Sequence, residues 1–300
     1  MSIRFTELGK IEIRVGTESN GQGHETTFKQ IASTRLGVPI EVLEYIQADT
    51  EQVTIGFGHG GARSMHMGAG TMALAIDSAI EKAGRVAATL LQTDIEELSF
   101  DKGAFLTSKD QRSVSIIEVA SAARNSDIMP SLGEYGIDTF YKREEAPFTF
   151  PNGCHAAEVE IDPDTGSLTL VNYVMVDDYG TLVNPALTEG QLHGGVVQGI
   201  GQALEEFVAF DPESGQLLSG SLMDYTAPRA ASFPFFKAHF QGVPTEANLL
   251  GVKGVGQAGC IAAPQVITHA VLNALQEYNI DHIQMPITSQ SLWRSIQAAS

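Results

Sequence analysis

The sequence is poor in cysteine, which argues against a protein held together by disulfides or by a structural zinc ion. Its 300 residues include only Cys154 and Cys260, which lie far apart and match no metal-ligand spacing. A disulfide framework and a structural zinc site are therefore not expected. We expect both thiols to be buried, as unpaired cysteines usually are. Such sparse cysteine usage favours a reducing, cytoplasmic compartment.

Basic residues and long apolar runs are also scarce. Lys and Arg number 18 against 36 Asp and Glu, which gives a formal net charge of −18. Binding to phosphate-rich polymers requires clustered Lys and Arg, so neither nucleic acid nor an anionic membrane is expected as the main partner. No apolar run approaches the roughly 20 residues that span a bilayer. The first residues, MSIRFTELGK, lack the apolar core of a signal peptide.

The apolar residues that are present follow both strand and helix periods. Alternation predicts strands, spacings of three and four predict helices, and the DPDTG turn predicts a hairpin. The mixture predicts an α+β fold with two lobes, residues 1–145 and 146–300, each with mixed sheets, hairpins and flanking helices. The predicted strands are 11–15, 42–49 and the hairpin 155–178; the predicted helices are 26–38, ending at Gly37, and Met72 to Leu90; 141–153 is predicted as a connection.

Glycine gathers in three places, the first of which is NGQGHETTF at residues 20–28. It contains His24-Glu25, but a zinc-protease helix would need a second histidine where Phe28 stands. Two interpretations remain: a ligand-binding loop, or a turn that leads into a helix with Thr26 or Thr27 as its cap.

The second place is the predicted helix 188–207. Leu192, Val196, Ile200 and Leu204 form its apolar stripe, yet five glycines lie within it. Each glycine costs about 0.5–1 kcal/mol against alanine, so a close backbone approach is indicated. The partner is either another helix or a large polar ligand held by the amides of Gln191, Gln198 and Gln202.

The third place, GVGQAG at 254–259, matches the dinucleotide-binding pattern G-x-G-x-x-G. That fold needs a strand before the glycines and an acidic residue at the end of the next strand. The sequence offers neither, and only 41 residues follow Gly259, since 300 − 259 = 41. A nicotinamide- or flavin-binding fold of this type is therefore rejected.

Taken together, the motifs resemble those of the molybdenum hydroxylases. GQGHETTF, the glycine loop ending in Arg63-Ser64, VDDYGTLVNP, EGQLHGGVVQGIGQAL, GSLMDYTAPR and LGVKGVGQAG occur in the order seen in that superfamily. The sequence is similar to the second molybdopterin-binding region of the large subunit in bacterial carbon monoxide dehydrogenases, xanthine dehydrogenases and aldehyde oxidases.

This resemblance implies molybdopterin carrying molybdenum as the cofactor, in its cytosine dinucleotide form. It also implies insertion of oxygen from water into a C–H bond or carbon monoxide, with electrons leaving through 2Fe-2S and FAD on partner subunits. The residues that it implies as cofactor contacts are Gln22, Gly23, His24, Thr26, Arg63, Ser64, Asp178, Gly180, Thr181, Asn184, Gln191, Lys253, Gly254, Val255 and Gly256. None of them is expected to ligate the metal directly.

The sequence departs from the family at several of these motifs. Gln257 stands where the family has the glutamate that acts as catalytic base, Tyr179 often corresponds to cysteine, and the loop Gly58–Ser64 differs from the family's G-T-aromatic-G-S-R-S. The family's N-terminal half, with its own cofactor loop and substrate pocket, is not in the sequence. Two hypotheses follow: a hydroxylase component that is catalytic with an N-terminal-half partner, or a non-catalytic scaffold paralogue that has lost the base.

Overall fold

The computed structural model describes residues 1–124, 136–143 and 147–299 and shows an α+β fold of two compact units. The first unit comprises 1–149, 181–184 and 244–254, and the second comprises 150–180, 185–243 and 255–300. Two short segments from the second half of the chain therefore complete the first unit. These segments carry several of the residues predicted to bind a cofactor.

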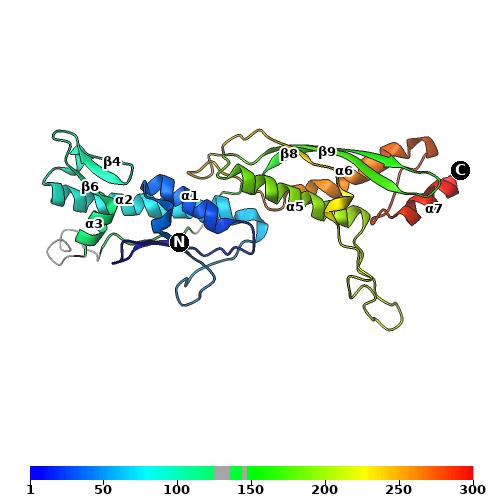
Figure 1. The fold of residues 1–300 in the computed structure, drawn as a ribbon, viewed down its shortest axis with the longest axis horizontal. Helices are drawn as coiled ribbons and strands as arrows, with labels where there is room; N and C mark the ends of the chain where they lie inside the picture. Colours follow the sequence, from blue (N-terminus) through cyan, green and yellow to red (C-terminus); the bar gives the residue numbers. More distant parts are fainter. Residues whose placement is uncertain (125–135, 144–146, 300) are drawn as a thin grey trace. The chain divides into compact units, whose positions relative to one another are not determined.

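The first unit is built on a four-stranded sheet in the order β3-β2-β1-β7. Strands β1 (Ser2–Phe5) and β2 (Ile11–Arg14) are antiparallel, β3 (Leu43–Ile46) is parallel to β2, and β7 (Thr139–Phe140) borders β1. Because side chains alternate along a strand, Ile3, Phe5, Ile11 and Ile13 all fall on the buried face. The helices α1 (His24–Leu36) and α2 (Gly70–Leu91) pack on each other and on this sheet (Figure 1).

Smaller elements complete the first unit. The antiparallel strands β4 (Leu98–Asp101), β5 (Ala104–Thr107) and β6 (Ser113–Ser115) form a sheet of their own. Helix α3 (Ile116–Ala122) begins with a capping box in which Ser115 and Glu118 bond each other's backbone. The single-turn helices are η1 (Ile40–Val42), η2 (Gly60–Ala62) and η4 (Ile95–Glu97), and η3 (Ser64–Ala69) is a π-helix that leads into α2.

The second unit contains a long hairpin and two packed helices. Strands β8 (Asn152–Ile161) and β9 (Leu168–Asp178) are antiparallel, and β10 (Lys237–Phe240) adds to β9 in parallel. The helices are α5 (Pro185–Leu204), α6 (Ala258–Ala274) and α7 (Ser289–Ala299), with the short η5 (Ala230–Ser232) and η6 (Gln276–Tyr278). The predicted hairpin is confirmed, and it begins early enough to include the end of the predicted connection 141–153.

The glycine-containing helix α5 packs against helix α6. A Cβ atom on Gly199 would lie 2.7 Å from Ala263 Cβ, and one on Gly259 would lie 2.7 Å from Leu192 O, so the backbones of α5 and α6 approach closely. The apolar stripe Leu192, Val196 and Ile200 is fully buried, whereas Gln198 and Gln202 are exposed. Of the two interpretations of these glycines, helix packing is the one that the structure supports.

Two expectations about single residues are wrong. The cap of α1 is neither Thr26 nor Thr27 but Gly23, whose φ of 77° is the left-handed conformation that glycine adopts readily. Thr27 Oγ1 instead donates back to Gly23 O at 3.2 Å. The cysteines are not buried: Cys154 is exposed near the start of β8 and Cys260 is partly exposed at the start of α6.

Candidate cofactor-binding site

In the first unit, two glycine-rich loops that are far apart in the sequence lie side by side. Thr17 and Ser64 share a hydrogen bond of 2.6 Å between their buried hydroxyls, and Phe57 N donates to Gly16 O at 3.0 Å. Asn20 Nδ2 lies 3.4 Å from His59 Nε2. A Cβ atom on Gly16 would meet Ile55 O at 2.4 Å, so glycine is required where the loops touch. The loop before α1 and the loop before η3 thus form one surface.

The first of these loops presents the start of α1. Gly21 and Gly23 both have positive φ, and Gln22 is held inward because Asn20 N donates to its Oε1 at 2.7 Å. None of the side chains that the structure describes caps the first turn of α1, and Thr26 in that turn is exposed. Such N–H groups, with the helix dipole behind them, are suited to a negatively charged group.

His24 opens α1 and is buried against Phe28, with ring centroids 5.8 Å apart. Burial lowers the pKa of His24, its bond to the Glu18 backbone opposes this, and the proximity of His59 lowers the pKa further. The ring is therefore held neutral. Its Nδ1 atom is buried without a hydrogen-bond partner among the described residues.

Arg63 and Ser64 line a cavity of about 140 Å³ at the second loop. The Arg63 guanidinium donates to Phe57 O, while its Nε is buried without a partner in the part of the chain that the structure describes. Lys142 and Arg143, which follow β7, line the same cavity, as does Thr17. The sequence offered little to single out Lys142 and Arg143, because they lie in a run of mixed charge, KREE, within a predicted connection.

The segment 244–254 brings Gly254 to the second loop. A Cβ atom on Gly254 would meet Ala62 O at 2.6 Å, so the backbone carrying Lys253 and Gly254 packs directly against the residue before Arg63. Thr181 N donates to Gly251 O at 2.9 Å, which ties the segment 181–184 to the same region. The first unit therefore gathers the predicted contacts at the start of α1, at Arg63-Ser64 and at Lys253-Gly254.

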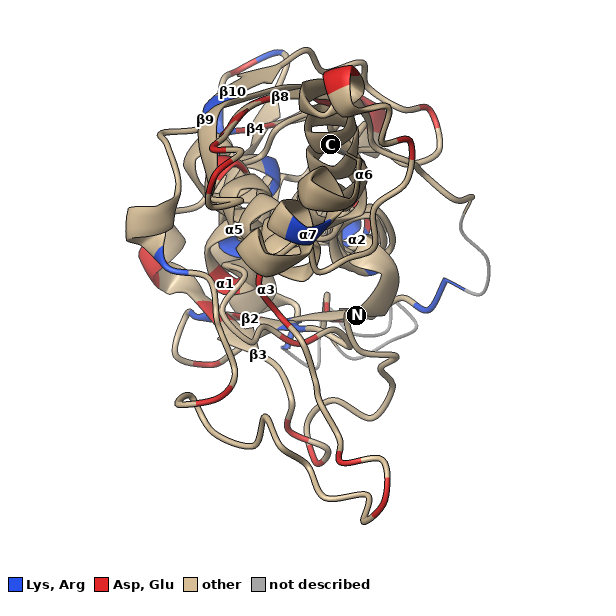
Figure 2. Ribbon diagram, turned by 90° about the vertical axis from the view of Figure 1, so that its right-hand side faces the viewer, with Lys and Arg blue, Asp and Glu red and all other residues tan. Residues whose placement is uncertain are grey.

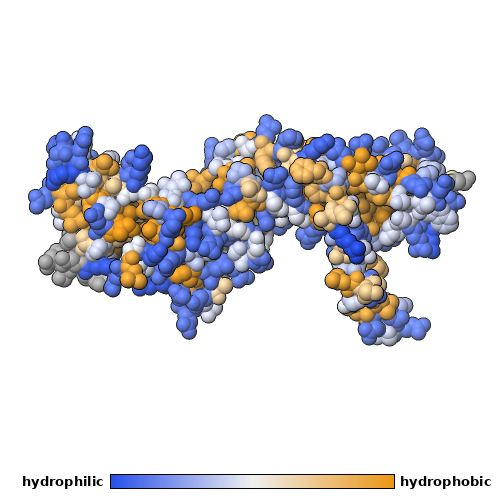
Figure 3. All heavy atoms as spheres, in the orientation of Figure 1, coloured by the Kyte–Doolittle hydropathy of each residue, from blue (hydrophilic) through white to orange (hydrophobic). Residues whose placement is uncertain are grey.

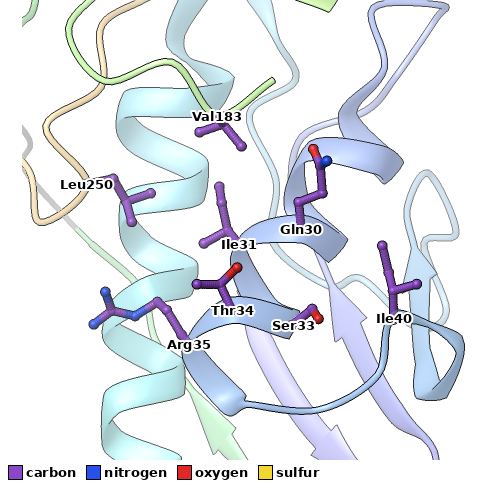
Figure 4. A pocket seen from close by; sticks show the side chains of 8 residues that line it. All are labelled: Gln30, Ile31, Ser33, Thr34, Arg35, Ile40, Val183 and Leu250. Carbon is purple, nitrogen blue, oxygen red and sulfur yellow. The ribbon is translucent and has the colours of Figure 1, made fainter. Parts of the chain in front are cut away.

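Asn184 bonds Gln30, which lines a second cavity of about 470 Å³ on the first unit (Figure 4). Its Nδ2 donates to Gln30 Oε1 at 3.1 Å. The cavity is lined by Gln30, Ile31, Ser33, Thr34, Arg35, Ile40, Val183 and Leu250. The one charged group in this lining, Arg35, is paired with Asp77 at 2.5 Å and 2.6 Å. We therefore give this cavity no part in binding an anion.

The second unit places Asp178 and Gly180 at the end of β9. Asp178 Oδ1 accepts from Gly180 N at 2.8 Å and from Val243 N at 2.9 Å, so this carboxylate holds the turn together. Its neighbour Asp177 faces the interior, where it lies 3.2 Å from His155 Nε2. Tyr179 is also buried, and both burial and the charge of Asp177 raise its pKa.

Gln191 and Gln257 lie at the two helices that pack through glycine. Gln191 is half-buried one turn before Gly195, whose Cβ position would be 3.1 Å from Cys260 N. Gln257 is exposed at the N-cap of α6, and its side chain makes no capping hydrogen bond with any residue that the structure describes. Val255 and Gly256 precede it, and a Cβ on Gly256 would meet no described atom within 4 Å. The backbone before α6 is thus open to a ligand.

These donors fit a phosphate-bearing, heteroatom-rich cofactor. Both glycine loops offer backbone N–H groups, and buried nitrogen atoms of His24 and Arg63 have no partner among the described residues. Buried polar atoms are normally hydrogen-bonded, so these two nitrogen atoms fit hydrogen bonding to a ligand at the loops. Among residues 1–124, 136–143 and 147–299, no group of three His, Cys, Asp or Glu could hold a metal ion. The N–H, amide and guanidinium donors at the loops suit the organic part of a cofactor.

Three basic residues, Arg63, Lys142 and Arg143, line the 140 Å³ cavity, which is unusual in a chain with twice as many acidic as basic residues. Acidic side chains are spread over many helices and loops and outnumber basic ones (Figure 2).

No helix in the described part of the chain is both long and apolar enough to cross a membrane.

Comparisons with known proteins point to the same kind of site, one that binds an organic cofactor. The family model described as a molybdopterin cofactor-binding domain matches residues 1–234. The carbon monoxide dehydrogenase large chain of Hydrogenophaga pseudoflava is 32% identical over 98% of this chain and 36% of that protein. The nicotine 6-hydroxylase large subunit of Paenarthrobacter nicotinovorans is also 32% identical, over 98% and 36%. The crystal structure of a Cu,Mo-CO dehydrogenase superposes with a TM-score of 0.92 at 31% identity and covers 99% of this chain and 37% of that one. The chain thus spans a little over a third of the length of these relatives.

Proposed function

Because the chain belongs to the molybdopterin cofactor-binding domain family, we propose that it supplies the C-terminal part of the cofactor site in a molybdenum hydroxylase-type oxidoreductase. The observation that carries this proposal is the meeting of the two glycine loops in the first unit, where buried nitrogen atoms of His24 and Arg63 have no partner among the described residues. A loop surface built in this way is poorly explained without a ligand.

The proposed contacts divide between the units. In the first unit they are Gln22, Gly23, His24, Thr26, Arg63, Ser64, Thr181, Asn184, Lys253 and Gly254; in the second they are Asp178, Gly180, Gln191, Val255 and Gly256. When bound, the cofactor supplies two-electron oxidation–reduction chemistry. The chain's own contribution is to bind phosphate and pterin edges through N–H, amide and guanidinium donors. We propose a dinucleotide form, because the cations at the cavity beside Ser64 suit a diphosphate, and we propose cytosine as its base because the resemblance of the motifs implies that form.

The proposed partner is a chain or segment corresponding to the N-terminal half of the large subunit. Large apolar side chains lie on the surface of the arm, which we define as residues 205–229 between α5 and η5 (Figures 1 and 3). Leu222 is 81% exposed and Met223 is 91% exposed. Large exposed apolar groups of this kind mark interaction surfaces. Subunits with 2Fe-2S and FAD would accept the electrons, and the two unpaired cysteines support a cytoplasmic location.

A second candidate function, a scaffold without catalysis, is favoured by one residue. Gln257 occupies the position of the family's glutamate base, and a carboxamide has no basic form at neutral pH. Such a paralogue would bind the cofactor and the partner but turn over slowly or not at all. Carbon monoxide and nicotine-like aromatic heterocycles are the substrate classes that the named relatives suggest for a catalytic complex.

Purification of the chain with its natural partners, followed by assay of molybdenum and pterin, tests the proposal. We expect both to co-purify in equal amounts with the complex, and nucleotide analysis to release a cytidine phosphate. A homogeneous complex without pterin would overturn the proposed function. Turnover of carbon monoxide or a heterocycle by that complex then separates the enzyme from the scaffold.

A further inference from the structure

We propose that His155, Tyr173 and Asp177 form a buried network that positions the turn after β9, residues 178–180, for the cofactor. The inference rests on the proposed function and deepens it, because it adds residues that the motifs did not indicate as contacts. The three are positioning residues: none is a proposed contact itself, but the turn that follows Asp177 carries two of the proposed contacts.

The three side chains meet on the buried face of the second unit's sheet. His155 Nε2 lies 3.2 Å from both carboxylate oxygens of Asp177, and His155 Nδ1 lies 3.0 Å from Tyr173 Oη. The side chains of His155 and Asp177 are only 3% and 4% exposed, and Tyr173 is fully buried. A carboxylate can only accept hydrogen bonds, so Nε2 carries the hydrogen between His155 and Asp177. Bonds at both ring nitrogen atoms hold the imidazole in one orientation.

The neighbours of the network leave it little freedom. A Cβ atom on Gly153 would overlap Asp177 Oδ1, so the carboxylate lies directly against the backbone of β8. The Tyr173 ring packs edge-on against His155 and Phe236, with ring centroids 5.7 Å and 5.6 Å apart. Burial raises the pKa of the Tyr173 hydroxyl, and the charge of Asp177 raises it further. The phenol therefore keeps its hydrogen for the bond with the imidazole.

Asp177 connects this network to the turn. Its backbone oxygen accepts from Gln241 N at 2.9 Å, just beyond the pairing of β10 with β9. The next residue, Asp178, accepts from Gly180 N at 2.8 Å and from Val243 N at 2.9 Å. Because successive side chains of a strand point to opposite faces, fixing Asp177 inward also fixes the direction of Asp178. A displaced Asp177 carboxylate would therefore loosen the turn.

This end of the sheet also carries the connections of its three strands to the first unit. Asn152 of β8 pairs with Asp178 of β9, and Phe240 of β10 pairs with Asp177, so the three strand ends lie side by side. The chain passes between the units close to each of these ends, at 149/150, 180/181 and 243/244. A network at this end therefore positions more of the chain than one in the middle of the sheet would.

Stability alone is a poor reason for a carboxylate in this place. Taking a charged group out of water is costly, and well-packed apolar residues of similar volume are often at least as stabilising. A hydrogen-bonded network differs from apolar packing because each donor has to meet its acceptor, which selects one arrangement. The turn beside the network is where such an arrangement matters for the proposed function.

Hydrogen exchange of the full chain, read by mass spectrometry, tests whether the network holds the turn. The reporters are the backbone amides that donate at the turn, Gly180, Gln241 and Val243. We expect Asp177→Asn to speed their exchange at least tenfold and Tyr173→Phe about threefold to tenfold, from the usual worth of charged and neutral hydrogen bonds. Tyr173→Phe removes only a hydroxyl and carries the test if Asp177→Asn fails to fold. The matched control, Asp164→Asn, makes the same change at an exposed position in the turn at the other end of the hairpin and should leave the exchange unchanged.

Release of pterin from the complete complex tests whether the position of the turn matters to the cofactor. Asp177→Asn should release pterin at least tenfold faster than the original chain. Leu170→Ala provides the comparison, because Leu170 is buried on the same strand but away from the turn, so its loss lowers stability in general. At the same interval below each melting temperature, Leu170→Ala should release pterin within threefold of the original chain.

Unchanged exchange at the reporter amides in both network variants, or an equal increase in Asp164→Asn, would overturn the proposal. Faster exchange without faster release of pterin would do the same, because the network would then hold the turn without serving the cofactor. Release from Leu170→Ala as fast as from Asp177→Asn would reduce the effect to lost stability and overturn it as well. An original complex without pterin sinks the proposed function instead, and the exchange rates still decide whether the network holds the turn.

Discussion

At position 257 the chain carries a carboxamide on the exposed start of α6, directly after an open stretch of backbone. We expect Gln257→Glu to raise the hydroxylation rate of the complete complex more than tenfold, because a positioned general base typically contributes about 10²–10⁴ in rate. The measurement is steady-state dye reduction with carbon monoxide or a nicotine-like heterocycle, normalised to pterin content.

The control for this substitution is Gln265→Glu, which makes the same chemical change on an exposed position of the same helix. It should leave the rate unchanged. If the original chain is already fast and Gln257→Glu adds nothing, another residue supplies the base and the scaffold hypothesis is also lost.

His24 makes stability depend on pH. Burial lowers its pKa below the ordinary value of 6.5, so the unfolded chain takes up a proton first as the pH falls. Stability from the neutral ring is therefore present above the unfolded pKa of about 6.5 and is lost as the pH falls below it toward the lower folded-state pKa. We expect the melting temperature to fall less between pH 7.5 and pH 5.5 in His24→Gln than in the original chain.

The matched variant for His24 is His282→Gln, since His282 is exposed in the other unit. That variant should keep the full pH dependence of the melting temperature. Identical pH dependence in all three proteins would show that protonation of His24 does not oppose folding.

Among the secondary-structure elements, α5 contains both glycines that helix packing requires and glycines that it does not. A Cβ atom on Gly199 would lie 2.7 Å from Ala263 Cβ and 2.9 Å from Cys260 O, whereas a Cβ on Gly194 would meet no described atom within 4 Å. We expect Gly199→Ala to lower stability by about 1–3 kcal/mol through overpacking. Gly194→Ala should raise it by about 0.5–1 kcal/mol through helix propensity.

Urea unfolding of the two alanine variants measures whether the free energy of unfolding falls in Gly199→Ala and rises in Gly194→Ala. A rise in both variants would mean that α5 and α6 can separate at little cost, and a fall in both would mean that Gly194 has a neighbour after all. The larger Gly195→Val should behave like Gly199→Ala, because its Cβ would lie 3.1 Å from Cys260 N.

At the scale of the whole molecule, the arm is a surface that presents several large apolar side chains to solvent. A short hairpin forms its first part: Leu218 N donates to Ala209 O at 2.8 Å, and Asp211 N donates to Gln216 O at 2.8 Å. Tyr225 OH donates to Glu206 Oε1 at 2.6 Å and ties the return of the arm to its beginning. The arm is thus structured, yet it presents apolar side chains to solvent.

We expect the double substitution Leu222→Ser and Met223→Ser to weaken binding of the N-terminal-half partner at least tenfold. Full burial of each such side chain is worth about 1.5–3 kcal/mol, which the serines would forfeit. Affinity between the separately purified chains is the measurement. Leu8→Ser is the matched control, because Leu8 is 91% exposed but lies in the other unit. Equal affinity of the double variant and the control would remove the arm from the interface, and concentration-dependent dimers would assign it to a second copy of this chain.

Local pattern predicted much of this fold because the relevant forces act between near neighbours. The alternation around DPDTG predicted the β8–β9 hairpin, and apolar spacing from Met72 to Leu90 predicted α2, since each pattern shows which face must be buried. Gly37 marked the end of α1 because its φ of 64° suits glycine. The order of the glycine and amide motifs was likewise enough to indicate the family.

What the sequence by itself determined is therefore the elements and the chemistry of its motifs, while tertiary structure decided which residues meet. Positions 194 and 199 are both glycine on the same helix, and the sequence does not distinguish them. Only the position of α6 makes Gly199 necessary for packing and leaves Gly194 replaceable. Cys154 is exposed although its residue type predicts burial, because only its place on β8 sets its exposure. Lys142 and Arg143 join Thr17 and Ser64 only through the pairing of β7 with β1. Such contacts depend on packing between distant segments, and no local periodicity records that packing.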